Sequence, residues 1–175
     1  MSFPLYSLKL VPIRSARDPA DRAKQRAKRA TWHKIPQYRI VLRKERTIRA
    51  PRILVDGPDV AAEVAHGLIG DSPFEKLLTI LINSANAIVG VVISATSSAI
   101  SQTSAMPRGI FAAALAHNAS AIVLAHNHPS GHVEPSREDL AFALTMEQQS
   151  NVLNVPILDH LIVTMDPARW RSFKP

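Results

Sequence analysis

The stretch AIVLAHNHPSG, residues 121–131, joins a short apolar run to two histidines and a Pro/Gly loop. The run 121–125 has strand length and no polar residue, which predicts a strand buried on both faces. His126 and His128 are two residues apart, so on an extended segment their side chains point to the same side. The end of a buried strand therefore presents two imidazoles together.

A carboxylate follows at a distance that allows it to join them. Asp139 lies eleven residues beyond His128, within EPSREDL (134–140), where a helix is predicted to begin. Two His and one carboxylate suit Zn²⁺ with a fourth position open for water, which is typical of catalytic zinc sites. The same ligands also accept iron or cobalt. Ordinary loop histidines are the alternative, and Ser136 with Asp139 also forms a helix-capping pattern compatible with a metal-facing Asp139.

The neighbouring segments alternate between strand and helix patterns, which predicts a mixed α/β fold. Residues 70–73 form a break, 83–86 a hairpin turn, and 94–104 a loop or irregular strand. The predicted strands are 38–42 with a partner in 47–53, 75–82, 87–93, 121–125 and 156–163; the predicted helices are 18–31, 57–69, 107–118 and 136–149.

Positive charge is concentrated in the N-terminal part of the chain. The 175 residues carry a net charge of +7, but the segment 14–52 alone contains 14 Lys and Arg against 3 acidic residues. The remainder has 7 basic and 11 acidic residues. This asymmetry indicates a polyanion partner, a solvated arm, or a segment that docks on an acidic protein. We expect a basic arm at 1–36 and one body domain at 37–175.

Composition also limits the class of protein. The chain has no cysteine, which removes disulfides and thiolate ligands and leaves His and carboxylate side chains for any metal. No apolar run approaches the ~18 residues needed to span a membrane, so we expect no membrane partner. Pro4 and Pro12 interrupt a short N-terminus, so we expect no secretory signal and a cytoplasmic location.

The metal pattern resembles a known group. His126, His128 and Asp139 match the His-x-His-x₁₀-Asp signature of the JAB/MPN zinc hydrolases, called JAMM. Segments 107–131, 134–140 and 158–163 resemble one branch of that group more closely, the RadC family. The resemblance extends over about 38–173. It implies an α/β fold of mixed α+β type, in which helices flank a curved mixed β-sheet with cytidine-deaminase-like architecture. We expect the basic N-terminal helical arm to be attached to this domain.

The resemblance also implies a role for each matching residue. His126, His128 and Asp139 would be the ligands of Zn²⁺. Ser136 would donate a hydrogen bond to the oxyanion of a tetrahedral intermediate. Glu75, which opens a predicted strand, would be the general base.

Other positions keep alternatives open. Glu63 is the fallback for the general base, and Glu75 could instead be an exposed charge at a strand end. The pair Asp159-His160 matches the family and would lie either beside the metal or as a structural polar pair on a strand. His132 departs from the family pattern, and we expect it to be a solvated loop residue.

Two functions from different classes follow. The first is a zinc metallopeptidase or isopeptidase that hydrolyses amide bonds of a peptide or protein conjugate through zinc-activated water. The alternative is a DNA-associated protein, of the repair, processing or binding kind, that contacts nucleic acid through the basic segment 14–52. Longer relatives carry an N-terminal helix-hairpin-helix module, in whose place we expect the basic arm. The substrate and the oligomeric state are not readable from the sequence.

Overall fold

The computed structural model describes residues 2–12, 35–50, 53–97 and 107–174. The predicted helix at 18–31 lies outside these residues. In chain order the elements are β1 (Ser2–Pro12), β2 (Tyr38–Arg49), α1 (Pro58–Ala65), the π-helix η3 (His66–Gly70), β3 (Glu75–Ile82), β4 (Ile88–Ser97), α2 (Pro107–Ala116), β5 (Ala121–Asn127), α3 (Arg137–Leu153), β6 (Ile157–Val163) and β7 (Trp170–Phe173).

The strands form one mixed sheet with the order β2-β1-β4-β3-β5-β6-β7. Pairing is antiparallel between β1 and β2, β3 and β4, β3 and β5, and β6 and β7. It is parallel between β5 and β6 and, at a single pair of residues, between β1 and β4. The predicted mixed α/β class is therefore confirmed.

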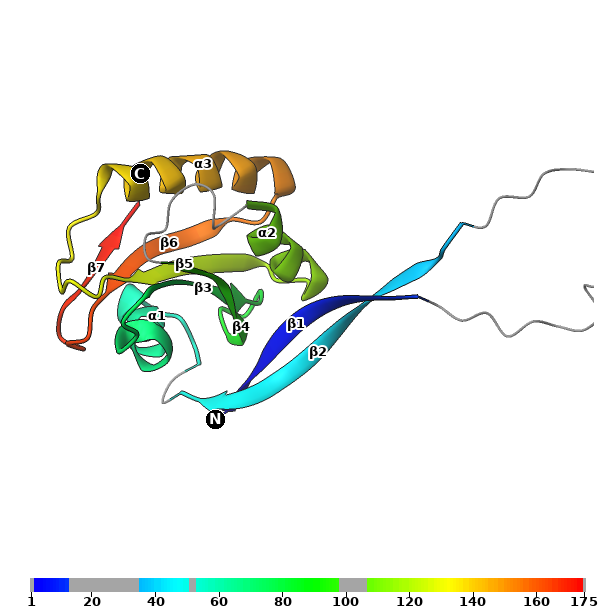
Figure 1. Ribbon diagram of the computed structural model, residues 1–175, viewed down its shortest axis with the longest axis horizontal. Helices are drawn as coiled ribbons and strands as arrows, with labels where there is room; N and C mark the ends of the chain where they lie inside the picture. The colour runs from blue at the N-terminus through cyan, green and yellow to red at the C-terminus, as the bar shows by residue number, and fades with distance from the viewer. Residues whose placement is uncertain (1, 13–34, 51–52, 98–106, 175) are drawn as a thin grey trace, which may run out of the picture.

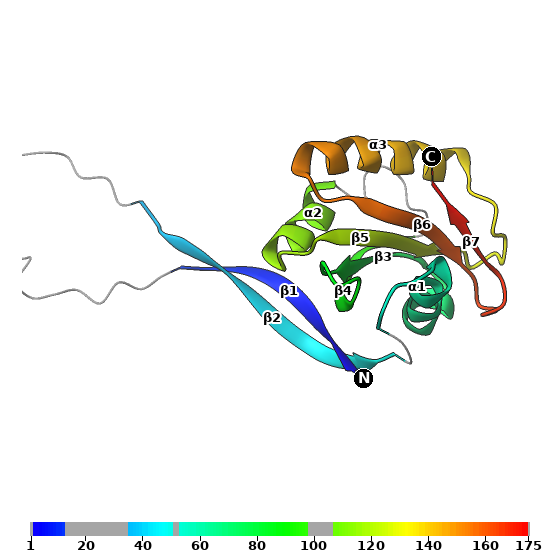
Figure 2. The ribbon, with the colours of Figure 1, turned by 180° about the vertical axis from the view of Figure 1, so that it is seen from behind.

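Helices cover both faces of the sheet, α1 on one and α2 with α3 on the other (Figures 1 and 2). Two apolar clusters fill the spaces between these layers. Alternation along the strands assigns side chains to one cluster or the other: Leu78 and Ile80 pack on the α1 side, and Leu77 and Leu81 on the α2–α3 side. Because β5 is covered on both faces, each of its residues is buried, as its unbroken apolar run predicted.

The N-terminal strands differ from the prediction. Residues 38–42 do not turn back onto 47–53; β2 is one continuous strand, because Arg43–Arg46 contains no Gly, Pro, Asn or Asp to make a turn. Its partner is β1, a strand that the sequence did not indicate and that lies within the range predicted as an arm. The boundary at residue 36 stays a prediction.

The other elements agree with their predictions within a few residues. The helix predicted to end at about Ile69 ends one residue later, at Gly70, as the π-helix η3, and the hairpin of β3 and β4 has its turn at 83–86. β4 continues to Ser97, and the rest of the predicted loop lies outside the described residues. Among the described helices, none has the length and apolar character needed to cross a lipid bilayer.

Candidate metal centre

Two histidines come from the end of β5. His126 is the penultimate residue of the strand, lies opposite Leu77 of β3, and is almost fully buried. By alternation from Leu124 its side chain points to the α2–α3 side of the sheet. His128 follows the strand directly and is half-buried; its backbone N–H donates to the carbonyl of Val163 on β6. The sheet thus holds both imidazoles on one face.

The carboxylate comes from the first turn of α3. Ser136 is the N-cap of this helix, and its hydroxyl oxygen accepts a hydrogen bond from the backbone N–H of Asp139. The Asp139 carboxylate in turn accepts from the backbone N–H of Ser136 at 2.8 Å, which completes a capping box. The predicted capping role is therefore present, and it fixes the side chain of Asp139 above the end of β5.

The three side chains converge on one point. The Nε2 atoms of His126 and His128 are 3.0 Å apart. Each faces the Asp139 carboxylate, at 3.3 Å from Oδ1 for His126 and 3.5 Å from Oδ2 for His128. All ligand atoms of the group lie within 4.8 Å of one another, so it could hold a metal ion. Two facing imidazole lone pairs repel each other unless a proton or a cation lies between them, so the donor set fits a metal.

The charges of the group are strongly coupled. Burial opposes ionisation of Asp139, but its hydrogen bonds with His126 and His128 hold the pKa of this carboxyl well below its ordinary range. The hydrogen bond with Asp139 raises the pKa of His128 against the opposing effect of burial, and the charge of Glu75 contributes in the same direction. Asp139 therefore stays ionised, and its negative charge favours a positive partner, either a protonated imidazole or a cation.

A backbone carbonyl fixes the orientation of His128. Its Nδ1 donates to the carbonyl oxygen of His132 at 2.8 Å. This bond places a proton on Nδ1 and leaves Nε2 directed at His126 and Asp139 as the atom available to a metal, as metal-ligating histidines require. His132 contributes through its backbone, and its own side chain is exposed.

Glu75 begins β3 on the same face as the histidines. Leu77, two residues along, is buried on the α2–α3 side, so alternation points Glu75 to that side too. Extending the β3–β5 register by two residues places Glu75 opposite His128, and its charge acts on the pKa of His128. The fallback Glu63 lies on α1, which covers the other face of the sheet.

The Ser136 hydroxyl is already engaged in this structure. It donates to Asp139 Oδ2 at 2.6 Å while its oxygen accepts from the Asp139 backbone. The structure therefore brings Ser136 to the site as a neighbour of Asp139, and the assignment as oxyanion donor stays a prediction.

A second polar group lies beside the metal ligands. His160 on β6 is buried, with its Nε2 3.8 Å from Oε1 of Glu147 on α3. Neither atom has a hydrogen-bond partner within the part of the chain that the structure describes. The Phe173 ring contacts both His160 and His126. The sequence indicated His160 but not Glu147, whose position on α3 carries no local signal.

Asp159, the other residue of the Asp159-His160 pair, links β6 to β7 at the edge of the sheet. The Asp159 carboxylate accepts from the backbone N–H of His160 and from the hydroxyl of Ser172 on β7. This arrangement supports the structural interpretation for Asp159, whereas His160 faces the buried side beside the metal group.

The fold and the site together define a mixed α/β domain with a His-His-Asp group at the end of a central strand. The family model described as "RadC-like JAB domain" matches residues 55–175, which include the whole candidate metal centre. The chain belongs to this family.

Curated relatives are similar over the same region. A UPF0758 protein of Picosynechococcus sp. is 34% identical over 115 residues, which is 66% of this chain and 47% of that protein. A UPF0758 protein of Variovorax paradoxus is 34% identical over 113 residues, covering 65% of this chain and 50% of the relative. One of Aromatoleum aromaticum is 38% identical over 96 residues, covering 55% and 42%. The chain spans about half the length of the curated relatives it matches.

Proposed function

We propose that this protein is a zinc-dependent hydrolase of amide or isopeptide bonds. The observation that carries the proposal is the convergence of two imidazole nitrogens, which can each ligate a metal when neutral, and one carboxylate at the end of β5. His126, His128 and Asp139 are the ligands, and the substrate is a peptide or a protein conjugate. Bound zinc supplies Lewis acidity and lowers the pKa of its water to about 7.

The remaining steps belong to side chains of this chain. Glu75, opposite His128, takes the proton of the attacking water and passes it to the leaving amine. Ser136, at the N-terminus of α3, donates to the developing oxyanion once its hydroxyl turns away from Asp139. Half-burial of Glu75 and His128 limits access of bulk water, which strengthens these interactions.

The first experiment is metal content by mass spectrometry. We expect about one zinc per chain for the wild type and none for the His126→Ala/His128→Ala double variant. Glu63→Gln, on the opposite face of the sheet, is the control and keeps its zinc. A wild type that binds no zinc after reconstitution would remove the basis of the hydrolase proposal.

The second experiment measures hydrolysis of a fluorogenic peptide library by the zinc-loaded protein. We expect activity that a chelator abolishes and that Glu75→Gln reduces by about 10²–10⁴, the contribution of a positioned proton carrier, without loss of zinc. Unchanged activity in zinc-loaded Glu75→Gln contradicts the assignment of Glu75.

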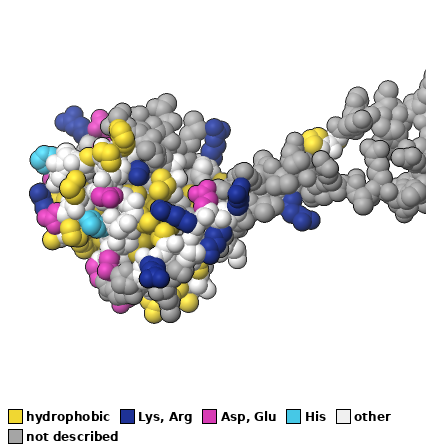
Figure 3. Space-filling view, turned by 60° about the horizontal axis from the view of Figure 1, so that its bottom comes forward, with side chains coloured by type: hydrophobic (Ala, Val, Ile, Leu, Met, Phe, Trp, Pro, Cys, Tyr) yellow, Lys and Arg dark blue, Asp and Glu magenta, His cyan; other side chains and the backbone are white. Residues whose placement is uncertain are grey.

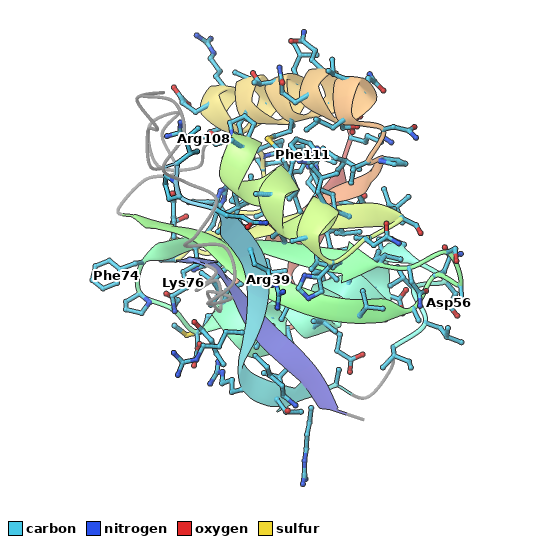
Figure 4. The ribbon with its side chains drawn as sticks, turned by 90° about the vertical axis from the view of Figure 1, so that its right-hand side faces the viewer. Arg39, Asp56, Phe74, Lys76, Arg108 and Phe111 are labelled. Atoms are coloured by element: carbon cyan, nitrogen blue, oxygen red, sulfur yellow. The ribbon has the colours of Figure 1, made fainter. Side chains whose placement is uncertain are left out.

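A second candidate function rests on a separate observation, the charge of β2. Within 38–49 five Lys and Arg side chains accompany one Glu, and all six are exposed. With β1 this strand forms a twisted ribbon that extends away from the body, with Arg39 on it (Figures 1 and 4). Figure 3 shows Lys and Arg where the ribbon meets the body, while both signs of charge are mixed on the body itself. Basic two-stranded ribbons can enter a nucleic-acid groove.

Nucleic-acid binding through 14–52 is tested with duplex DNA of arbitrary sequence at several salt concentrations. We expect affinity to fall steeply with salt and the slope to decrease by about one for each phosphate contact removed in Arg43→Ala/Arg46→Ala. Arg137→Ala/Arg169→Ala removes the same charge from the body and is the control. Equal binding by both variants contradicts the ribbon as an interface. Deletion of 1–36 is a poorer test because it also removes β1.

A further inference from the structure

Asn127 lies between the two histidines of the metal group and faces the other way. It is the last residue of β5 and fully buried. Alternation along the strand points its side chain to the α1 side of the sheet, away from His126 and His128. A buried amide that contacts neither the ligands nor solvent needs hydrogen-bond partners elsewhere.

All of its partners lie in one short segment about fifty residues earlier in the chain. The Asn127 side-chain oxygen accepts from the backbone N–H of Lys76 at 2.8 Å. Its side-chain nitrogen donates to the carbonyl of Ser72 at 3.1 Å and to the carbonyl of Phe74 at 3.2 Å. The amide cannot be reversed, because its NH₂ group would then face the Lys76 N–H and its oxygen would face two carbonyls.

A side chain within the segment 72–76 also hydrogen-bonds the backbone of that segment. The buried Ser72 hydroxyl donates to the carbonyl of Phe74 at 2.7 Å and accepts from the Phe74 N–H at 3.3 Å. Phe74 itself is exposed and packs little, as Figure 4 shows at the edge of the body near Lys76. Hydrogen bonds rather than apolar packing therefore fix the chain as it enters β3.

Glu75 lies between two of the residues that Asn127 holds, Phe74 and Lys76. We infer that Asn127 is a positioning residue, whose side-chain amide fixes the backbone of 72–76 and so places the Glu75 carboxylate opposite His128. The inference rests on the proposed function, in which Glu75 takes a proton beside the metal. The end of β5 thus fixes both histidines and, through Asn127, orients the Glu75 carboxylate.

The first test measures amide hydrogen exchange in the metal-free protein. Asn127→Asp keeps the acceptor for Lys76 but sets an oxygen against the carbonyls of Ser72 and Phe74; Asn127→Ala removes all three bonds. We expect the amide of Lys76 to exchange about tenfold faster in Asn127→Ala, the effect of losing a hydrogen bond. Unchanged exchange at Lys76 overturns the inference.

Two further variants keep this test informative if Asn127→Ala does not fold. Ser72→Ala loosens the same segment without touching β5, and we expect faster exchange across 72–76. Thr79→Val removes a buried hydroxyl contact, to Ser94 at 2.8 Å, from the same strand β3. It is the matched control, and exchange at 72–76 should stay at the wild-type rate.

The second test separates positioning from a purely structural role. We expect the visible spectrum of the cobalt-loaded protein to change with pH as the metal-bound water ionises, and the midpoint of that change to report the surroundings of the metal. We expect Asn127→Asp to shift this midpoint in the same direction as Glu75→Gln, and the double variant to shift it no further than Glu75→Gln alone. Thr79→Val should leave the midpoint unchanged.

The outcomes distinguish the inference from the proposed function. The role of Asn127 is overturned if Glu75→Gln shifts the pH midpoint of the cobalt spectrum and Asn127→Asp does not. It is also overturned if the shifts of the two single variants add fully in the double variant. No cobalt binding, or no shift in cobalt-loaded Glu75→Gln, contradicts the proposed function instead, while the exchange of Lys76 still reports whether Asn127 holds the segment.

Discussion

At the scale of single residues, the candidate site pairs an ionised carboxylate with two imidazoles, and the donor atoms of all three could hold a cation. Asp139 is held ionised by its neighbours, and Glu75 adds a second negative charge near His128. Two histidines and two carboxylates within one end of a sheet are costly to bury without compensation. A divalent cation at the proposed metal site would provide that compensation.

Ser136→Ala separates two roles of one hydroxyl. Loss of the N-cap should lower the free energy of unfolding by about 1 kcal/mol, measured by urea denaturation. Loss of an oxyanion donor should lower the rate of peptide hydrolysis by about 10²–10³ at full zinc content. Ser136→Thr keeps a hydroxyl and should retain both properties. A destabilised Ser136→Ala with the wild-type rate would leave capping as the only role.

His160 predicts a pH dependence of stability in the metal-free protein. Burial, with the charges of His126 and Lys174, lowers its pKa to about 4. Unfolded His160 takes up a proton below about pH 6.5, so between pH 6.5 and 4 the unfolded state binds more protons and stability falls as pH falls. The loss is on the order of 3 kcal/mol. Urea denaturation of His160→Asn across this range should give a flatter profile; an identical slope contradicts the prediction.

At the scale of elements, the π-helix η3 shows how tightly the layer opposite the site is packed. The His66 ring donates from Nε2 to the carbonyl of Met165 at 3.0 Å, and Gly70 lies against the same ring. A Cβ at Gly70 would lie 2.7 Å from His66 Cδ2 and 3.0 Å from the backbone oxygen of Thr164. A side chain is therefore excluded there by a hydrogen-bonded ring and a strand end.

Gly70→Ala should lower the free energy of unfolding by about 1–3 kcal/mol through overpacking. Gly67→Ala in the same π-helix is the control, because nothing lies within 4 Å of its added Cβ, and it should be neutral or slightly stabilising. Thermal unfolding of both variants measures the difference. Both should keep their zinc, since η3 lies on the other face of the sheet, and equal stability of the two variants would contradict the packing argument.

At the scale of the whole molecule, the site joins β3, β5 and α3, so metal binding should stabilise the folded state as a unit. Zinc at 100 times its dissociation constant should add about 2.7 kcal/mol to the free energy of unfolding. His128→Ala should lose this gain. His132→Ala should keep it, because the backbone carbonyl and not the side chain of His132 binds His128. Thermal unfolding with and without a chelator checks both variants.

The parts of this structure that could be predicted have local signals. The buried run 121–125 and the Ser-x-x-Asp pattern at Ser136 each specify their element within a few residues, because apolar periodicity and capping act over one or two turns of chain. The pairing of β2 with β1 was not predictable in this way, since strand partners are chosen by long-range contacts. Asn127 carried no signal for the same reason.

The sequence by itself determined the residue types at the end of β5 and the start of α3, and with them the possibility of a metal group at this position. Only the tertiary structure decided that Glu75 lies opposite His128, that His132 acts through its backbone, and that Asn127 holds the segment before β3. These relations join residues four to fifty-five positions apart. They arise from sheet register and loop closure, which no local run of sequence specifies.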